Sequence, residues 1–299
     1  MSERLRAATR GSALALWQTR HVAALLGREV DEVVVSTVGD RNTDVPIHTM
    51  GGKGVFVKEV QAALLDGRAD IAVHSGKDLP AITPPELMVV AVPARADARD
   101  ALVGSTWETL PIGAKVATGS VRRRAQLAWH RPDLLFSELR GNISTRLERL
   151  ESGGFDAIVM AAAALDRLDL ALDTPVDRLD PSIMVPQVAQ GALAIECRAD
   201  DTPTIEALAA IQHPQTRRVF DAERAFLDEL GGDCDLPAGA HGVLAGADEI
   251  ELVGMLSSLD GRVMIRERRS GADPDALGRE VARFLLDERG GTDLLADTR

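Results

Sequence analysis

The sequence has 299 residues, of which 45% are hydrophobic and 27% are charged, and its formal net charge is −12. This is an ordinary globular composition, and the chain is too long for a single hydrophobic core, so we expect two or three domains. The acidic balance argues against non-specific binding to nucleic acid or to anionic membranes.

The sequence shows few features typical of membrane insertion, secretion, disulfide bonding or metal binding. The longest uninterrupted apolar run, 157–165, has nine residues, whereas a helix needs about 20 to cross a bilayer. The first twenty residues scatter four arginines among short apolar stretches, which does not fit a signal peptide. The two cysteines are too few for a disulfide framework or a zinc finger, and the six histidines show no metal-ligand spacing. We therefore expect a cytoplasmic protein with no membrane span and no metal site.

The first part of the chain predicts alternating strands and helices. We expect strands over residues 5–8, 30–38, 70–74 and 87–92, a helix from the Ser12 cap to about Leu26, and a helix over 55–65. The polar, glycine-bearing stretch 39–54 is longer than ordinary connections in α/β units, so we expect it to be functional or mobile.

A similar pattern then recurs. The segments AATRGSALALW (7–17) and VATGSVRRRAQLAW (116–129) each contain a strand, a threonine, a serine and then a helix that carries a tryptophan. Each is followed downstream by Gly-x-x-Asp and an apolar strand, in GRADIAVHS and GGFDAIVMA. The repetition predicts two related α/β lobes.

The last third of the chain predicts a different arrangement of strands and helices. It predicts one more buried strand over 193–197, helices over 204–211 and 216–230, two strands around the Asp260-Gly261 turn, and a final amphipathic helix over 275–288. These elements indicate a small α+β domain after the two lobes.

Positive charge is concentrated in the first half of the chain. Residues 1–150 hold 20 Lys and Arg against 17 Asp and Glu, a balance of +3, whereas residues 151–299 hold 14 against 29, a balance of −15. Arginines also occur at the helix starts predicted at the Ser12, Ser120 and Asn142 caps, where the helix dipole already favours anions and disfavours cations. Because these starts follow strands of open α/β sheets, the side chains are expected to converge on a polyanion between the lobes; they are Arg10, Arg122, Arg123, Arg140 and Arg146.

Three further segments contain candidate functional residues. In HSGKDLP, Asp78 directly follows a buried strand and is a candidate catalytic carboxylate, the alternative being a turn or helix cap. GGKG around Lys53 lacks the spacing of a phosphate-binding P-loop, so a mobile lid is the better interpretation. Cys234 lies in a glycine-rich loop between two aspartates, which favours an attachment point over a fast thiolate nucleophile, and Cys197 is expected to be a packed core thiol.

Seven motifs follow one another over nearly the whole chain: ATRGSALALWQ, GGKGVFVKE, ADIAVHSGKDLP, the 118–123 segment, LRGNISTRL, QGALAIECR and GGDCDLPAGA. In this order they resemble the porphobilinogen deaminase (hydroxymethylbilane synthase) family. The resemblance implies two lobes like type II periplasmic binding proteins, with the chain crossing back to the first lobe, and a C-terminal α+β domain. It places domain 1 at 1–93 plus 188–212, domain 2 at 94–187 and domain 3 at 213–299.

The resemblance also implies an activity and a cofactor. Four porphobilinogen molecules would be condensed head to tail into linear hydroxymethylbilane, with release of ammonia, in tetrapyrrole biosynthesis. A dipyrromethane cofactor would be held through a thioether on Cys234, and Asp78 would be the catalytic carboxylate. A monomer is expected, with porphobilinogen as its small-molecule partner. The positions that would bind or face cofactor and substrate are Arg10, Ser12, Lys53, Lys77, Thr118, Ser120, Arg122, Arg123, Arg140, Arg146, Arg167 and Gln190.

Three positions depart from the family pattern. Gly76 stands where methionine is usual, Gly119 where serine is usual and Ala189 where glycine is common. The loss of a serine hydroxyl at 119 removes one possible side-chain donor.

Two other functions remain open from the residues alone. A cytoplasmic carboxylate-ligand-binding module of periplasmic-binding-protein ancestry would explain the lobes and the arginines, but it needs neither Asp78 nor a loop cysteine in a third domain. A thiol-based transferase would use Cys234 as a transient nucleophile and would show no stable adduct.

Overall fold

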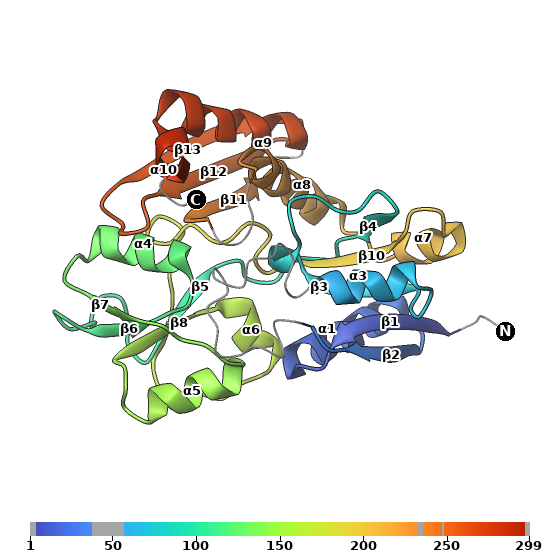
Figure 1. Cartoon of the computed structure of the whole chain (residues 1–299), viewed down its shortest axis with the longest axis horizontal. Coiled ribbons are helices and arrows are strands. Elements are labelled where there is room, and N and C mark those ends of the chain that lie inside the picture. The colour runs from blue at the N-terminus through green and yellow to red at the C-terminus, as the bar shows by residue number, and fades with distance from the viewer. Residues whose placement is uncertain (1–3, 38–56, 232–235, 247, 297–299) are drawn as a thin grey trace.

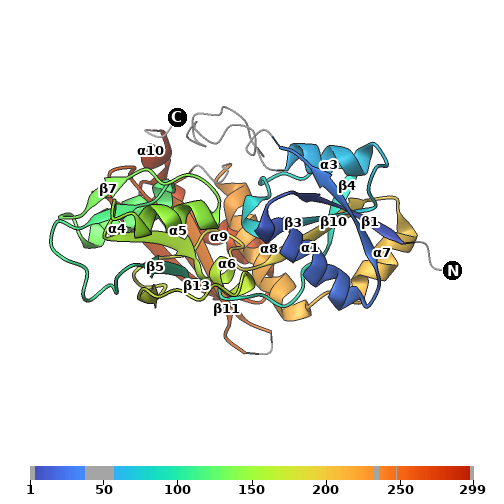
Figure 2. The same cartoon turned by 90° about the horizontal axis from the view of Figure 1, so that it is seen from below.

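The computed structural model describes residues 4–37, 57–231, 236–246 and 248–296. Three sheets with their helices form two lobes and a third region that packs across both (Figure 1). Seen from below, the two lobes lie side by side, and the third region lies behind them (Figure 2).

The first sheet has the strand order β2-β1-β3-β10-β4. β1 runs parallel to β2 and β3, whereas β10 is antiparallel to β3 and β4. The strand bounds are β1 Leu5–Arg10, β2 Val30–Val35, β3 Ile71–Ser75, β4 Leu87–Ala91 and β10 Leu193–Arg198.

The second sheet repeats this arrangement with different strands. Its order is β7-β6-β8-β5-β9; β6 is parallel to β7 and β8, and β5 is antiparallel to β8 and β9. The predicted duplication is therefore confirmed in strand order and direction. The bounds are β5 Asp100–Val103, β6 Lys115–Ala117, β7 Leu135–Ser137, β8 Ala157–Ala161 and β9 Val176–Arg178.

Three helices of the two lobes begin at the caps that the sequence predicts. The hydroxyls of Ser12 and Ser120 and the amide oxygen of Asn142 accept backbone N–H bonds from the first turns of α1, α4 and α5. α1 ends at Gly27, whose φ of 62° is the left-handed conformation that glycine adopts without strain. The lobe helices are α1 Ala13–Leu26, α3 Lys58–Leu65, α4 Val121–His130, α5 Ile143–Glu151, α6 Ala162–Arg167 and α7 Thr202–Ala209, with the 3₁₀ turn η2 Gly76–Asp78.

The third region is a three-stranded antiparallel sheet, β11-β12-β13, covered by helices. Its buried residues form one core cluster with Leu79, Val92 and Val188 of the first lobe and the segments that join the lobes. A shared apolar core therefore joins the third region to the first lobe and to the joining segments. Its elements are α8 Pro214–Glu229, β11 Ala238–Leu244, β12 Ile250–Ser257, β13 Met264–Gly271, α9 Pro274–Arg283, the π-helical turn η3 Phe284–Glu288 and α10 Gly291–Ala296.

The structure confirms the predicted fold class, two α/β lobes and a small C-terminal α+β domain, and corrects several element bounds. The run 157–165 is half strand and half helix, since β8 ends at Ala161 and α6 follows at once. The glycine-rich stretch after Cys234 was expected to be loop, but it contains β11. The final helix stops at Arg283 and continues as η3. The domain boundaries stay predictions, and the stretch 39–54 lies outside the described residues.

None of the described helices is both long and apolar enough to span a membrane.

Candidate active site

The carboxyl ends of β1, β3, β6 and β8 carry most of the predicted site residues. In open α/β sheets ligands bind at this edge. The antiparallel strands β5 and β10 begin where β8 and β3 end, since Asp100 pairs with Ala161 and Leu193 with Ser75. The segments that lead into β5 and β10 therefore cross between the two lobes at the same edge.

Asp100, the first residue of β5, is fully buried between two arginines of α4. Its Oδ2 lies 2.8 Å from Arg122 Nη1 and its Oδ1 lies 2.7 Å from Arg123 Nη2. Burial alone would raise the pKa of this carboxyl, but the two guanidinium groups outweigh it and hold the pKa well below its usual range. Asp100 thus stays ionised and fixes the first turn of α4.

Arg122 and Arg123 are also tied to backbone carbonyls. Arg122 Nη1 donates to Val185 O at 2.6 Å, and Arg123 Nη1 donates to Val159 O at 3.1 Å. Arg122 is 1% exposed and its pKa is lowered by burial. Arg122 therefore holds the crossing segment before β10 and has little surface left for a ligand, which makes it a support rather than a direct contact.

Gln190 joins the two lobes. Its Nε2 donates to Ala98 O at 2.8 Å and to Asp100 Oδ1 at 3.0 Å, and its Oε1 accepts from Lys77 Nζ at 3.3 Å. The side chain is 1% exposed. It therefore places the Lys77 ammonium of the first lobe beside the Asp100 pair of the second.

Lys77 lies in an environment that disfavours its positive charge. Burial, followed by the nearby Arg123, lowers its pKa to about 8, although Asp78 and Asp100 act in the opposite direction. Its ammonium forms no ion pair within the described part of the chain, where Gln190 is its hydrogen-bond partner.

Arg146, in the first turn of α5, lies in a similar environment. Burial and then the Arg123 and Arg140 guanidinium groups lower its pKa to about 10. Its Nε donates to Gly141 O at 2.9 Å, and no carboxylate of the described residues pairs with it. The pKa of Arg140 is also lowered, by burial, against the attraction of Glu138. We call Lys77, Arg122, Arg123, Arg140 and Arg146 the cationic cluster.

Asp78 ends the turn η2 directly after β3, next to the cationic cluster. Among the residues that the structure describes, its carboxylate accepts no hydrogen bond and forms no ion pair. The alternative of a capping role is not seen, because the caps in the lobes are supplied by other residues. Both oxygens are available to a ligand.

The predicted hydroxyl donors are partly engaged as acceptors. Ser12 and Ser120 cap their helices, and Thr118 Oγ1 accepts from Ser120 N at 3.2 Å. Each hydroxyl hydrogen can still be donated, because capping uses only oxygen lone pairs.

Arg167 and Arg10 lie at the edges of this site. Arg167 Nη2 donates to Gly191 O at 2.7 Å, and its guanidinium lies 5.8 Å from the Trp17 ring of α1, so it connects α6 to the first lobe. Burial lowers its pKa to about 10. Arg10 is the last residue of β1 rather than part of the connection before the Ser12 cap. Lys53 and Cys234 lie outside the described residues.

The sequence alone did not indicate Asp100, Arg95 or Glu223. Glu223 of α8 is fully buried and accepts from Arg95 Nη1 at 2.7 Å, Ala189 N at 2.7 Å and Gly242 N at 2.8 Å. An acid directly before the apolar run 101–103 was the one available signal for Asp100. Nothing local marks Glu223, because its partners come from three distant segments.

Two of the three departures from the family pattern, Gly76 and Gly119, have a structural explanation. A Cβ at Gly76 would lie 2.9 Å from Phe220 Cε2, and one at Gly119 would lie 2.9 Å from Leu139 O. Both glycines therefore allow close packing that a side chain would disturb. Ala189 has a φ of 57°, a left-handed conformation that glycine adopts more easily.

Two family models match the chain. Residues 5–206 match "Porphobilinogen deaminase, dipyromethane cofactor binding domain", and residues 218–287 match "Porphobilinogen deaminase, C-terminal domain".

Curated relatives match over almost the whole length. Proteins named porphobilinogen deaminase from Roseiflexus castenholzii, Trichlorobacter lovleyi and Bacillus subtilis are 46%, 43% and 41% identical to it. Each match covers 99% of this chain and 100%, 96% and 96% of the respective relative.

Two solute-binding proteins are among the solved structures to which the chain is similar. The second substrate-binding domain of a putative amino acid ABC transporter from Streptococcus pneumoniae has a TM-score of 0.43 at 12% identity, covering 77% of this chain and 95% of its own. An ancestral cationic amino acid solute-binding protein has a TM-score of 0.42 at 17% identity, covering 74% and 93%.

The full-length matches include the C-terminal domain, so they do not favour the alternative of a binding module alone. These matches show that the chain belongs to the porphobilinogen deaminase family, transferases of tetrapyrrole synthesis.

Proposed function

We propose that this enzyme performs the family's reaction with the cationic cluster as its carboxylate receptor and Asp78 as its catalytic carboxylate. The reaction is the stepwise head-to-tail condensation of four porphobilinogen molecules to linear hydroxymethylbilane, with release of ammonia. Porphobilinogen carries an acetate and a propionate group, so the growing chain is a polyanion.

The observation that carries the proposal is the presence of cations that form no ion pair with a described residue. Lys77 and Arg146 are two such cations, and burial, followed by the neighbouring arginines, lowers the pKa of each, although Asp78 and Asp100 act in the opposite direction at Lys77. Burying unpaired charge costs free energy unless a counter-charge arrives. A ligand with several carboxylates would supply that counter-charge.

The donor set fits a dipyrromethane group, which would bring four carboxylates. When bound, that group supplies the pyrrole carbon to which the first substrate is joined. Arg123, Arg140 and Arg146 would bind its carboxylates with guanidinium forks, and Lys77 would bind as a point charge. Ser12, Thr118 and Ser120 would add hydroxyl donors. We propose Cys234 as the attachment point through a thioether.

Asp78 would act on the pyrrole nitrogens. Its free carboxylate oxygens can accept pyrrole N–H bonds and stabilise the positive charge that develops during condensation. As a carboxylate it can also accept a proton and pass it on. Arg122 and Gln190 would hold Asp100 and Lys77 in place around it. We further propose that the enzyme is a cytoplasmic monomer with no nucleic-acid partner.

The direct test replaces Asp78 with alanine or asparagine. We expect kcat for hydroxymethylbilane formation to fall by about 10²-fold or more, because a positioned acid–base group contributes that much, while bound cofactor is retained. Glu86→Gln is the matched control, since Glu86 is an exposed acid shortly after the same turn. Near-normal turnover in both Asp78 variants would refute the role of this carboxylate.

A further inference from the structure

The position of Asp78 depends on how its turn is anchored. The carboxylate itself is bound by no other described residue, so only the backbone of η2 and the residues after it can fix its place. At the start of the turn, Gly76 N donates to Ala192 O at 2.9 Å, and Leu79 N donates to Gly76 O at 3.3 Å. The Leu79 side chain is 3% exposed and packs in the core that the first lobe shares with α8.

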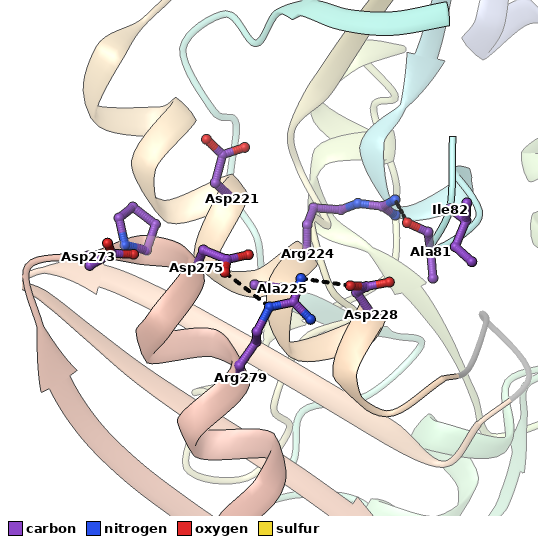
Figure 3. Close-up of a pocket in the computed structure, with 10 residues that line it drawn as sticks. Ala81, Ile82, Asp221, Arg224, Ala225, Asp228, Asp273, Asp275 and Arg279 are labelled. Atoms are coloured by element: carbon purple, nitrogen blue, oxygen red, sulfur yellow. Dashed lines mark hydrogen bonds and ion pairs between the residues drawn. The ribbon is translucent and has the colours of Figure 1, made fainter. Parts of the chain in front are cut away.

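Arg224 of α8 holds the chain immediately after Asp78. Its Nη1 donates to Leu79 O at 2.9 Å, and its Nη2 donates to Pro80 O and, at 2.8 Å, to Ala81 O. Figure 3 shows this guanidinium pointing from α8 toward Ala81, beside a surface pocket that shares no lining residue with the cationic cluster. One side chain thus binds three consecutive carbonyls, and the first of these belongs to the residue next to Asp78.

We propose that Arg224 is a positioning residue for Asp78. The inference rests on the proposed function, because it matters only if Asp78 is the catalytic carboxylate. The hydrogen bonds given above join Arg224 to the backbone of 79–81 and not to the cationic cluster. Arg224 acts by fixing the backbone that carries the carboxylate, and it does so from the third region of the molecule.

The geometry requires a guanidinium group. Its planar fork presents several donors in fixed directions, so it can serve three carbonyls at once, whereas an ammonium is a point charge on a flexible stem. Replacing Arg224 with lysine keeps the positive charge, but one ammonium cannot bind the carbonyls of Leu79, Pro80 and Ala81 in the same directions. Since a displacement of about 1 Å at a reacting group can cost roughly 10²-fold in rate, a looser turn should lower kcat.

The experiment compares Arg224→Lys with Arg217→Lys in the full-length, cofactor-loaded enzyme. Arg217 lies two turns earlier on α8 and also donates to a backbone carbonyl, that of Val89 at 3.0 Å, but this residue is in β4 rather than the Asp78 turn. We expect Arg224→Lys to lower kcat about tenfold or more, with KM within about twofold, because an interaction that acts only in the transition state affects kcat. Arg217→Lys should keep both values. Arg224→Ala should lower kcat further.

A double-mutant cycle separates positioning from a merely structural role. If Arg224 acts through Asp78, Arg224→Lys should have little further effect on turnover in an Asp78→Asn background, followed as stepwise mass increments. An unchanged kcat in Arg224→Lys, or an equal fractional loss with and without the Asp78 carboxylate, would overturn the inference. Failure of the proposed function would look different, because Asp78→Asn alone would then keep near-normal turnover.

Discussion

At the scale of single residues, the protonation of Lys77 makes the stability of the protein depend on pH. Its ammonium is buried beside Arg123, and its pKa is lowered from 10.5 to about 8. The unfolded chain therefore binds this proton more strongly than the folded protein between about pH 8 and 10.5. Stability must rise with pH across that window, because burial of the charged form disfavours folding below it.

Replacing Lys77 with methionine in cofactor-free protein should therefore raise the melting temperature at pH 7. The gain should shrink as pH increases from 8 toward 10, since the lysine of the parent then becomes neutral. Thermal unfolding at several pH values measures both effects. Lys58→Met is the control, because Lys58 is exposed on α3. A gain that is independent of pH would show that the charge of Lys77 is not the cause.

Residue types and their spacing predicted most of the described cationic cluster, but not its supports. Arg122 and Arg123 lie together at a helix start, where the helix dipole disfavours positive charge, and this unfavourable placement indicated a functional site. The sequence could not assign their different roles, which depend on Asp100 lying between them. Asp100 meets Gln190 only because two strands far apart in the chain begin at the same edge.

At the scale of elements, the segment that leads into β10 contains a strained residue. Ala189 is fully buried with a φ of 57°, and its N–H donates to Glu223 at 2.7 Å. A non-glycine residue in this conformation costs about 1 kcal/mol or more. The hydrogen bond to a buried carboxylate and the packing against Gly76 hold it in place.

Ala189→Gly should therefore stabilise the protein by up to about 1 kcal/mol, because glycine relieves the backbone strain. Denaturant unfolding of the two proteins measures the difference. Ala194→Gly, in the buried strand β10, is the matched control and should destabilise. A loss of stability in Ala189→Gly equal to that of the control would contradict the strain.

Elements with a clear cap or apolar period were predictable, and those that depend on distant partners were not. Ser12, Ser120 and Asn142 marked helix starts correctly, because the capping bond is local. β11 was missed because AGAHGVL has the glycines of a loop and becomes a strand only by pairing with β12. α6 was missed because the run 157–165 has no polar residue to mark where the strand ends.

At the scale of the whole molecule, the third region holds both lobes through arginines that donate to backbone carbonyls. Arg224 of α8 binds the turn after Asp78, and Arg266 of β13 donates to the carbonyls of Ser182 and Ile183 in the second lobe. The sequence predicted three units and the duplication of the lobes. It could not predict these contacts, because no local pattern distinguishes a solvated arginine from one that joins two domains.

The central claim is that the cationic cluster binds a polyanion that is covalently attached to the chain. Intact-protein mass spectrometry of the purified enzyme, alone and with porphobilinogen, tests it most directly, with Cys234→Ala as the matched variant. We predict a covalent excess of one dipyrromethane, further increments of one pyrrole unit each on addition of substrate, and no excess in Cys234→Ala. An active enzyme whose mass equals that of the bare chain would contradict the account.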